Sequence, residues 1–517
     1  MRGRVPGERV ERRFPPRSAG RAGKRYAGVP LVSGWNRRSP QRALAALVAP
    51  VAAFAALAAR YVRVGALGPD EGFYGMAARL AMRGLVPYRD FAYAQAHGFP
   101  YLHGALAEVA GFGLMPQRIL CAAYAGAAVV ALGAAAQLGR RIDGADLRQR
   151  RAGVAPGDAL PSGRRAFGLG LAAWAMATSP AWIAKASLVQ PCSMSGLFLM
   201  GAGAAALWMP EGRRRPWAIA ALGGLAVACK LIVLPAALVL WGYEFRRTRS
   251  WVAPVAVVAA LFVPFIAAAP GPWWFWNLGY HFALEGVDFR AWESYRDHLA
   301  LAPSVLVVAA AAMRGRGPAR VVLAAGVLAW VAQLPLRETH SDNAVPLVPL
   351  IALAAGELVA EWNPGLRARG ALVAGLLVSF AFRPPPVDPL LFHDLDEAAE
   401  VLRKEARPLL TPLPVVALES GRDVLPGLEM GPFCVTSELP EERARALHLW
   451  TLPALERELP AAGAVVLTPQ ASTWDFFWSV PSLRPTPPEQ RSSFFGAMRD
   501  AGYRKVLQNS QVAIFTR

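Results

Sequence analysis

The chain has 517 residues, of which 54% are hydrophobic, and it carries a formal net charge of +19. A strongly basic chain can bind nucleic acid, but here the Lys and Arg residues cluster in short stretches between long apolar runs. This pattern is typical of cytoplasmic loops in a membrane protein and argues against a nucleic-acid partner. We therefore predict a polytopic α-helical membrane protein with about 11 transmembrane helices.

The amino-terminal segment, residues 1–42, carries twelve Lys and Arg residues and only two acids, Glu8 and Glu11. A segment with high net charge and little apolar surface cannot build a core, so we expect it to be disordered. Its positive charge places it in the cytoplasm. The first apolar run, Ala43–Val62, begins too late for a cleavable signal peptide and is assigned as the first span.

A polar external loop, residues 63–116, follows this span. Its stretch Gly68–His103 reads GPDEGFYGMAARLAMRGLVPYRDFAYAQAHGFPYLH. Charges this close to a membrane boundary are costly unless they lie in water or serve a site. The candidate residues in this loop are Asp70, Glu71, Tyr74, Arg89, Asp90, Tyr93, Gln95 and His97.

Later apolar runs predict the other spans of a transmembrane domain that covers residues 43–383. Pro216–Phe245 is too long for one typical span and basic at both ends, so we expect a hairpin of two short helices that turns near Lys230 on the external side. Gly271–His298 is rich in Trp and Tyr, as expected at a membrane interface. The single spans are expected at about Arg118–Leu138, Ala166–Ile183, Gln190–Met209, Trp251–Ala269, Leu299–Met313, Val321–Leu336, Ala344–Glu361 and Ala371–Phe382.

Basic loops such as Gly139–Arg165 fix the orientation, because Lys- and Arg-rich loops stay in the cytoplasm. An odd number of spans then places the carboxy-terminal tail outside. The same topology, built only from apolar runs and arginines, places six charged or titratable residues on the external face. These residues are Asp70, Glu71, Asp90, Lys230, Arg337 and His340.

The tail, residues 384–517, begins with a proline-rich linker, RPPPVDP. We expect helices at His393–Ala406 and Pro488–Ala501, and short strands at Val415–Leu418, Ala464–Leu467 and Val512–Phe515. These elements predict a small α/β domain. No glycine-rich phosphate loop is present in it, so we assign no nucleotide.

The Asp70–Glu71 pair begins a predicted helix. One explanation is that an acid at this position only caps the helix. The other is a general base that takes a proton from an acceptor hydroxyl. Asp90 is a second acid on the same loop, and two acids could share a divalent cation or divide into a base and an orienting residue.

Lys230 lies between two apolar helices, where it could extend to the interface or bind a phosphate as a point charge. We favour the phosphate, because its predicted depth and side match those of the acidic loop. Arg89, Arg337 and His340 are further cations on this face, and each could also be an ordinary loop residue. The sequence contains no CxxC or HExxH metal motif, and Cys121, Cys192, Cys229 and Cys434 suggest no disulfide framework.

Three stretches resemble the GT-C superfamily of membrane glycosyltransferases. The nearest group is family-39-like and includes protein mannosyltransferases, the aminoarabinose transferase of lipid A, and Rhizobium lipopolysaccharide transferases that use polyprenyl-linked galacturonate. GPDEGFYGMAARLAMRGLVPYRDFAYAQ has the group's Asp-Glu pair and its Gly-x-x-Pro-Tyr-x-Asp run. GGLAVACKLIVLP is similar to its Gly-rich span ending in Lys, and RETHSDNAVPLVPLIALAAG to its His-Tyr-x-x-Pro-x-x-Pro span. The resemblance covers roughly Ala43–Phe382.

The resemblance implies an inverting hexosyl or pentosyl transferase of the bacterial inner membrane. A sugar would pass from a polyprenyl phosphate to a lipid, glycan or protein acceptor of the cell envelope, on the external face. Asp70 would be the base and Glu71 or Asp90 the orienting acid. The donor phosphate would contact Lys230, Arg89, His340 and Arg337, and the sugar or acceptor would contact Tyr74, Tyr93, Gln95 and His97. No cofactor is assigned beyond the divalent cation that two acids could share.

Two other functional classes stay open at this point. A transporter, or a flippase for lipid-linked sugars, predicts internal repeats and polar residues near the bilayer midplane. A non-catalytic membrane scaffold, whose tail binds cell-wall polymers, would tolerate the loss of Asp70.

Overall fold

The computed structural model describes residues 39–151, 162–283, 317–333, 343–362, 365, 387–469 and 478–517. The chain divides into two compact units, Met1–Arg42 and Ala43–Arg517, and the second contains nearly all of the described residues. The predicted basic tail, residues 1–42, lies almost entirely outside the described residues. The predicted spans Leu299–Met313 and Ala371–Phe382 lie outside them too, as do the candidates Arg337 and His340.

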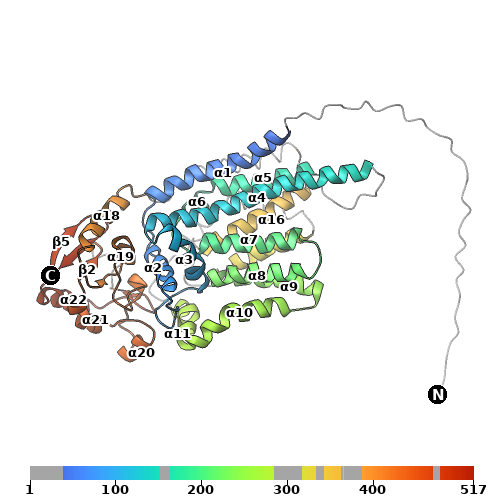
Figure 1. Ribbon diagram of the computed structural model, residues 1–517. Coiled ribbons are helices and arrows are strands. Elements are labelled where there is room, and N and C mark those ends of the chain that lie inside the picture. Colours follow the sequence, from blue (N-terminus) through green and yellow to red (C-terminus); the bar gives the residue numbers. More distant parts are fainter. Residues whose placement is uncertain are drawn as a thin grey trace, which may run out of the picture. The chain divides into compact units, whose positions relative to one another are not determined.

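Each predicted span within the described residues folds as helix (Figure 1). An apolar segment in lipid can satisfy its backbone N–H and C=O groups internally only as a helix or a closed barrel. The helices are α1 (Ser39–Val64), α4 (Leu114–Arg151), α5 (Ser162–Thr178), α6 (Pro180–Ala186), α7 (Cys192–Trp208), α8 (Arg214–Cys229), α9 (Leu234–Thr248), α10 (Val252–Ala268), α15 (Pro318–Val331) and α16 (Val348–Trp362).

The hairpin expected in Pro216–Phe245 is confirmed. Helix α8 ends at Cys229, Lys230 has an extended backbone, and a short 3₁₀ turn at Leu231–Val233 leads into α9. Pro235 in the first turn of α9 explains the new helix start, because proline fits the beginning of a helix but not its interior. Lys230 is therefore the residue at which the two short helices separate.

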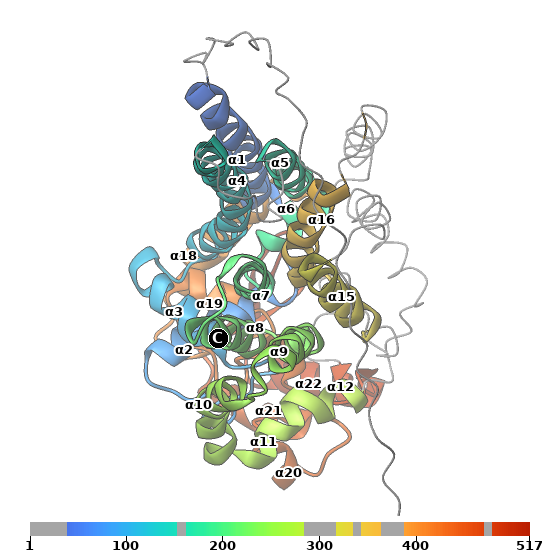
Figure 2. The same cartoon turned by 90° about the vertical axis from the view of Figure 1, so that its right-hand side faces the viewer.

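Glycine and alanine allow the helices to approach closely. A Cβ atom added at Gly168 of α5 would lie only 2.0 Å from the Gly356 carbonyl oxygen of α16, so these two backbones are in contact. Close approach through small residues is the usual way in which membrane helices pack. Helices α5, α16, α15 and α9 follow one another in this order in Figure 2, and each contacts the next.

Two helices in the described part of the chain are long and apolar enough to cross a bilayer unaided, Leu114–Ala136 and Val345–Trp362. A third span results if Val252–Ala268 and Pro270–Ala283, which meet at a bend of 120°, are taken together. The predicted total of about 11 is therefore not confirmed by this length criterion. Breaks such as the one at Ser179, between α5 and α6, divide apolar runs into shorter helices.

The polar loop after α1 folds into two helices, α2 (Glu71–Met82) and α3 (Gly98–Ala110). A Cβ atom added at Gly104 would lie 2.9 Å from the Ala78 carbonyl oxygen, so the two helices pack backbone to backbone. The segment between them contains a turn in which the Tyr88 N–H donates to the Phe91 carbonyl oxygen at 2.8 Å. This segment carries Arg89, Asp90, Tyr93, Gln95 and His97.

The carboxy-terminal part contains a mixed four-stranded sheet, in agreement with the predicted small α/β fold. The strand order is β1 (Leu409–Leu410), β2 (Ala464–Leu467), β6 (Ala513–Thr516) and β5 (Arg504–Gln508). Strand β1 is parallel to β2, and the other neighbours are antiparallel. A separate hairpin pairs β3 (Trp478–Ser479) with β4 (Arg484–Pro485). The helices are α18 (Leu391–Leu402), α19 (Pro414–Ser420), α20 (Glu441–Ala446), α21 (Leu452–Glu458) and α22 (Pro488–Asp500).

The strand predicted at Val415–Leu418 is wrong, because these residues form most of helix α19. Pro414 begins this helix, and Gly421 ends it with a left-handed φ of 69°. Proline at the first helical turn and glycine just past the last are strong boundary signals. Here they outweigh the strand propensity of the two valines. The strands predicted at Ala464–Leu467 and near Val512–Phe515 are confirmed as β2 and β6.

The carboxy-terminal part packs directly on α2 and shares its hydrophobic core. A Cβ atom added at Gly72 would lie 2.7 Å from the Val415 nitrogen of α19. Arg79 donates to the Arg422 carbonyl oxygen at 2.9 Å, and Arg83 bonds to Asp423 at 2.7 Å. Helix α2 is therefore held between the membrane helices and the tail.

Glu429 gives this carboxy-terminal part an expected pH dependence. Its two carboxyl oxygens both accept from the Gly427 N–H, at 2.9 and 2.8 Å, and burial raises the pKa of Glu429 to about 7. The folded protein thus holds this proton more tightly than the unfolded chain, in which the pKa is about 4.3. The stabilisation is complete below the unfolded pKa and is lost as the pH rises through 7.

We expect the thermal unfolding midpoint of the detergent-solubilised protein to fall by about 2–4 °C between pH 5.5 and pH 8 through this group. The Glu429→Gln variant keeps the shape of the side chain but cannot ionise, so its midpoint should fall less over the same range. Equal falls in the two proteins would show that Glu429 does not carry the effect.

Candidate active site

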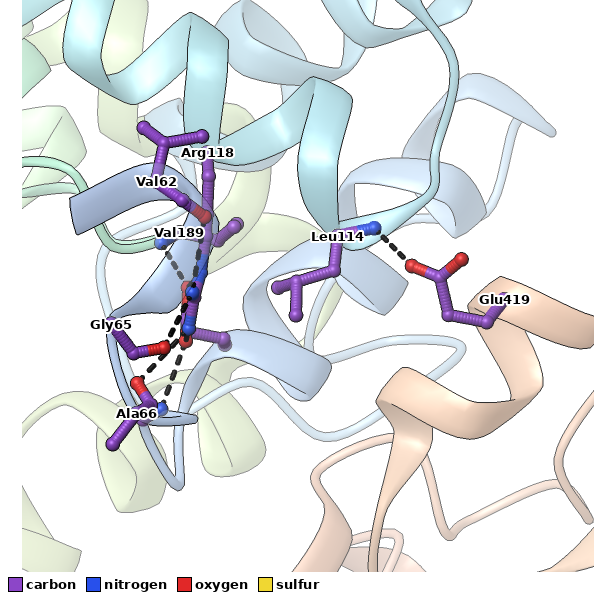
Figure 3. Close-up of polar contacts among 9 residues, drawn as sticks. Val62, Gly65, Ala66, Leu114, Arg118, Val189 and Glu419 are labelled. Atoms are coloured by element: carbon purple, nitrogen blue, oxygen red, sulfur yellow. Dashed lines mark hydrogen bonds and ion pairs between the residues drawn. The ribbon is translucent and has the colours of Figure 1, made fainter. Parts of the chain in front are cut away.

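Glu71 forms a fully buried ion pair with Arg118 of helix α4; Figure 3 labels Arg118 and its carbonyl partners Gly65 and Ala66. The Arg118 Nε donates to Glu71 Oε1 at 2.8 Å and its Nη2 to Oε2 at 2.5 Å, and both side chains are 0% exposed. The guanidinium also donates to the carbonyl oxygens of Gly65 and Ala66, at 2.9 and 3.0 Å. Arg118 therefore ties the end of α1 to the start of α2.

The Glu71 carboxylate has two further donors, the backbone N–H groups of Gly68 at 2.8 Å and of Val189 at 2.9 Å. A buried ion pair is stable only when such hydrogen bonds satisfy its remaining lone pairs. Both carboxylate oxygens of Glu71 are engaged in these contacts, which hold the loop in place. The geometry therefore favours a structural role for Glu71 over the orienting role that the sequence suggested.

Arg118 is not among the candidate site residues from the sequence, which assigns it only as the beginning of the second span. One signal was available. A lone arginine at the start of an apolar run needs a partner, because an unpaired charge at a membrane boundary is costly. The sequence did not show that this partner is Glu71, which lies 47 residues earlier.

Asp70 differs from its neighbour in both exposure and contacts. It occupies the N-cap position of α2 and is partly exposed, and its side chain makes no capping hydrogen bond to the helix. The Asp70 carbonyl oxygen accepts from the Tyr74 N–H at 3.1 Å, which is the first backbone hydrogen bond of the helix. The capping explanation therefore does not account for the Asp70 carboxylate.

Lys230 is buried at the break between α8 and α9, with 5% of its surface exposed. Its Nζ lies 3.2 Å from the Cys192 sulfur at the start of α7. Cys192 belongs to the turn Ser187–Cys192, which also contributes the Val189 N–H that contacts Glu71. One short turn thus contacts both the first turn of α2 and the buried lysine.

The end of the external loop approaches Lys230 from another direction. A Cβ atom added at Gly98, the first residue of α3, would lie 2.7 Å from the Ala228 carbonyl oxygen of α8. Ala228 precedes Lys230 by two residues. The structure therefore brings the Asp70–Glu71 end of α2, the start of α3 and Lys230 into one neighbourhood, and their common place on the external face of the membrane stays a prediction.

Arg89 and Asp90 are bonded to each other. The Arg89 Nε donates to Asp90 Oδ1 at 2.9 Å and its Nη2 to Oδ2 at 2.8 Å, while the Val86 N–H donates to Oδ2 at 2.7 Å. The hydrogen bonds from Arg89 lower the pKa of Asp90, so it stays ionised near neutral pH. These contacts shape the turn, and the predicted roles of Arg89 at the phosphate and of Asp90 as an orienting acid stay predictions.

The four residues expected at the sugar or acceptor differ in burial and in contacts. Tyr74 and Tyr93 are buried, with ring centroids 6.2 Å apart in an edge-to-face arrangement. Gln95 is partly exposed, and its backbone carbonyl oxygen accepts a hydrogen bond from the Tyr88 hydroxyl at 2.5 Å. His97 instead contacts α10, with its Nε2 2.8 Å from the Leu261 carbonyl oxygen and its ring stacked 3.6 Å from that of Phe265. These contacts favour a structural role for His97.

No protein-family model matches the sequence, and no curated protein is significantly similar to it. Solved structures do match. The apo structure of ArnT from Cupriavidus metallidurans superposes with a TM-score of 0.57 at 15% identity, over 92% of this chain and 98% of that one. The chain has the ArnT fold. A second ArnT structure, "bound to Undecaprenyl phosphate", gives a TM-score of 0.55 at 13% identity, over 94% and 98% of the two chains.

ArnT is an aminoarabinose transferase with a GT-C glycosyltransferase fold. At these identities the likeness establishes the fold alone, and this fold agrees with the predicted GT-C type. The matches cover 94% and 92% of this chain, so they include most of the carboxy-terminal part as well as the membrane helices. The residues of the site have to be argued from their own contacts.

The sequence left open whether two acids of the loop at residues 63–116 share a divalent cation, and the contacts of these acids bear on this question. Among the described residues of this GT-C fold, no three or more His, Cys, Asp or Glu side chains are grouped so that they could hold an ion. Glu71 is fully engaged by Arg118, and Asp90 is bonded to Arg89. The acids of the described loop do not fit a shared divalent cation, and no step is assigned to one.

Proposed function

We propose that this protein is a membrane glycosyltransferase that moves a sugar from a polyprenyl-phosphate donor to an acceptor of the cell envelope. The observation that carries the proposal is that a buried lysine and a partly exposed acid both lie near the turn Ser187–Cys192. Lys230 lies on one side of this turn, and the first turn of α2, with Asp70, on the other. The ArnT fold supports the proposal, since an ArnT structure contains undecaprenyl phosphate.

In the proposed reaction the acceptor hydroxyl attacks the anomeric carbon of the sugar. Asp70 takes the hydroxyl proton as the new carbon–oxygen bond forms, which is general base catalysis. The bond between the anomeric carbon and the phosphate oxygen breaks, and the polyprenyl phosphate leaves with the electron pair. Lys230 stabilises the negative charge that develops on the leaving phosphate. A single displacement of this kind inverts the anomeric configuration.

Several finer points belong to the same proposal. The sugar is a hexose or a pentose, the acceptor is a lipid, glycan or protein, and the site faces the outside of a bacterial inner membrane. The orientation rests on the alternation of arginine-rich loops along the sequence. It places the amino terminus in the cytoplasm and the carboxy-terminal part outside.

Lys230 provides the test of the donor site. Replacing it with alanine removes a charged donor, and such contacts contribute about 1.5–3 kcal/mol, so binding of undecaprenyl phosphate should weaken roughly 10- to 100-fold. Lys230→Arg keeps the charge and should lose less. Titration of undecaprenyl phosphate onto the detergent-solubilised protein, followed by native mass spectrometry, measures both affinities.

The matched control is Lys404→Ala, because Lys404 is exposed in the carboxy-terminal part. Its affinity for undecaprenyl phosphate should equal that of the wild type. If Lys230→Ala also binds with wild-type affinity, Lys230 does not contact the donor phosphate. The proposed site would then be wrong.

A further inference from the structure

The turn that follows helix α20 connects the carboxy-terminal part to two segments of the membrane domain. The Leu447 carbonyl oxygen accepts from the Trp276 Nε1–H at 3.1 Å, and the Trp276 ring is 0% exposed. The next residue, His448, has its Nε2 at 3.0 Å from the Tyr88 carbonyl oxygen in the first external loop. Two consecutive residues, here named the 447–448 turn, thus form hydrogen bonds to two segments. One is Phe275–Gly279, here named the aromatic segment, which contains Trp276, and the other is the loop that carries Arg89 and Asp90.

Both partners of the second bond have an unusual backbone. His448 has a φ of 57° and Tyr88 a φ of 69°, in the left-handed region that is uncommon for residues other than glycine, although histidine enters it more often than tyrosine. Such conformations persist where surrounding contacts enforce them. Burial lowers the pKa of His448, so the ring is neutral near pH 7. Because a carbonyl oxygen only accepts, Nε2 is the ring nitrogen that carries the proton.

Tyr88 organises the loop that it begins. Its ring is 0% exposed, its hydroxyl donates to the Gln95 carbonyl oxygen at 2.5 Å, and its N–H donates to the Phe91 carbonyl oxygen at 2.8 Å. The Arg89–Asp90 pair follows Tyr88 directly. The loop then continues to Gly98, which abuts Ala228 just before Lys230. A displacement of Tyr88 would therefore be transmitted to both Asp90 and the end of the loop near Lys230.

We propose that the 447–448 turn clamps the first external loop against the aromatic segment, and that His448 is a positioning residue of the transferase site, acting through Tyr88. The clamp itself follows from the contacts. Its effect on transfer rests on the proposed function. The carboxy-terminal part then contributes to the transferase site, because it fixes the position of the loop that faces the acceptor.

Hydrogen–deuterium exchange on the full-length protein in detergent tests the clamp without any substrate. The Tyr88 N–H and the Asp90 N–H are hydrogen-bonded within the loop, to Phe91 and Val86. In His448→Ala, peptides covering residues 86–91 should exchange about three- to tenfold faster, the effect expected from losing one buried hydrogen bond. His448→Gln can place an amide N–H near the position of Nε2 and should restore part of the protection. His393→Ala, an exposed histidine on α18, is the control and should exchange as the wild type does.

Kinetics then separate the clamp from the proposed reaction. If the wild type transfers sugar, His448→Ala should raise the KM for the acceptor or lower kcat severalfold, with the KM for the donor unchanged and partial rescue by His448→Gln. Wild-type exchange at residues 86–91 in His448→Ala would overturn the clamp. Faster exchange with unaltered kinetics would overturn the positioning role. Faster exchange in a protein whose wild type transfers no sugar would leave the clamp standing and reject the proposed function.

Discussion

The Asp70→Asn variant should insert and fold as the wild type does, yet transfer sugar about 10²–10⁴-fold more slowly, the usual cost of losing a general base. Asn has nearly the same shape as Asp and caps helices about as well. The Asp70 side chain also makes no capping hydrogen bond to α2 that the substitution could break. The variant therefore removes a proton acceptor without breaking a side-chain cap. The measurement is the initial rate at which polyprenyl phosphate is released from a lipid-linked sugar.

The control for this experiment is Asp500→Asn, at the exposed end of α22 in the carboxy-terminal part. It carries the same chemical change at a residue outside α2 and the loop of residues 63–116, and it should keep the full rate. A thermal unfolding midpoint equal to that of the wild type would show that Asp70→Asn is folded. Near-normal turnover by this variant would remove Asp70 from the mechanism and leave Asp90 as the acid to examine.

The second large effect is expected from the buried ion pair. Removing one partner of such a pair leaves an uncompensated charge, which costs about 3–5 kcal/mol. Both Glu71→Gln and Arg118→Leu should therefore lower the free energy of unfolding by this order, measured in mixed detergent micelles. The loss should exceed that of an ordinary surface variant, because the pair also holds the backbone at Gly65, Ala66 and Val189.

Two comparisons make this prediction specific. The double variant Glu71→Gln/Arg118→Leu has no unpaired charge, so it should be more stable than the sum of the two single losses predicts. Breaking the exposed pair between Glu441 and Arg457 through Glu441→Gln should change stability by less than about 1 kcal/mol. If Glu71→Gln lost no more stability than Glu441→Gln, the ion pair would not hold the loop.

Much of the membrane domain could be predicted from the sequence, because hydrophobicity and basic loops are local signals. The hairpin at Lys230 is the clearest example. Its apolar run was too long for one span and basic at both ends, and the structure divides it at that lysine. The grouping of Lys230 with the start of α2 also followed from topology alone, and the turn Ser187–Cys192 now connects them.

The features that the sequence did not reveal depend on distant partners. Asp70 and Glu71 look equivalent as neighbours, and only the position of Arg118 in space distinguishes the partly exposed Asp70 from the buried Glu71. The packing of α19 on α2 depends on Gly72, because the Val415 backbone lies where a side chain would otherwise be. No local sequence pattern predicts that contact. The bond between His448 and Tyr88 spans 360 residues and is equally invisible in the sequence.

The proposed function is tested most directly by transfer from defined donors. Purified protein in lipid nanodiscs is supplied with synthetic undecaprenyl-phosphate-linked hexoses and pentoses and with an envelope extract from cells that lack this protein. Mass spectrometry then quantifies the undecaprenyl phosphate released and the sugar added to the extract. We predict that the wild type releases undecaprenyl phosphate from at least one donor, in step with sugar transfer, and about 100-fold or more faster than Asp70→Asn does. Release that is no faster with the protein than without it for every donor, or equal rates for the wild type and Asp70→Asn, would contradict the proposal.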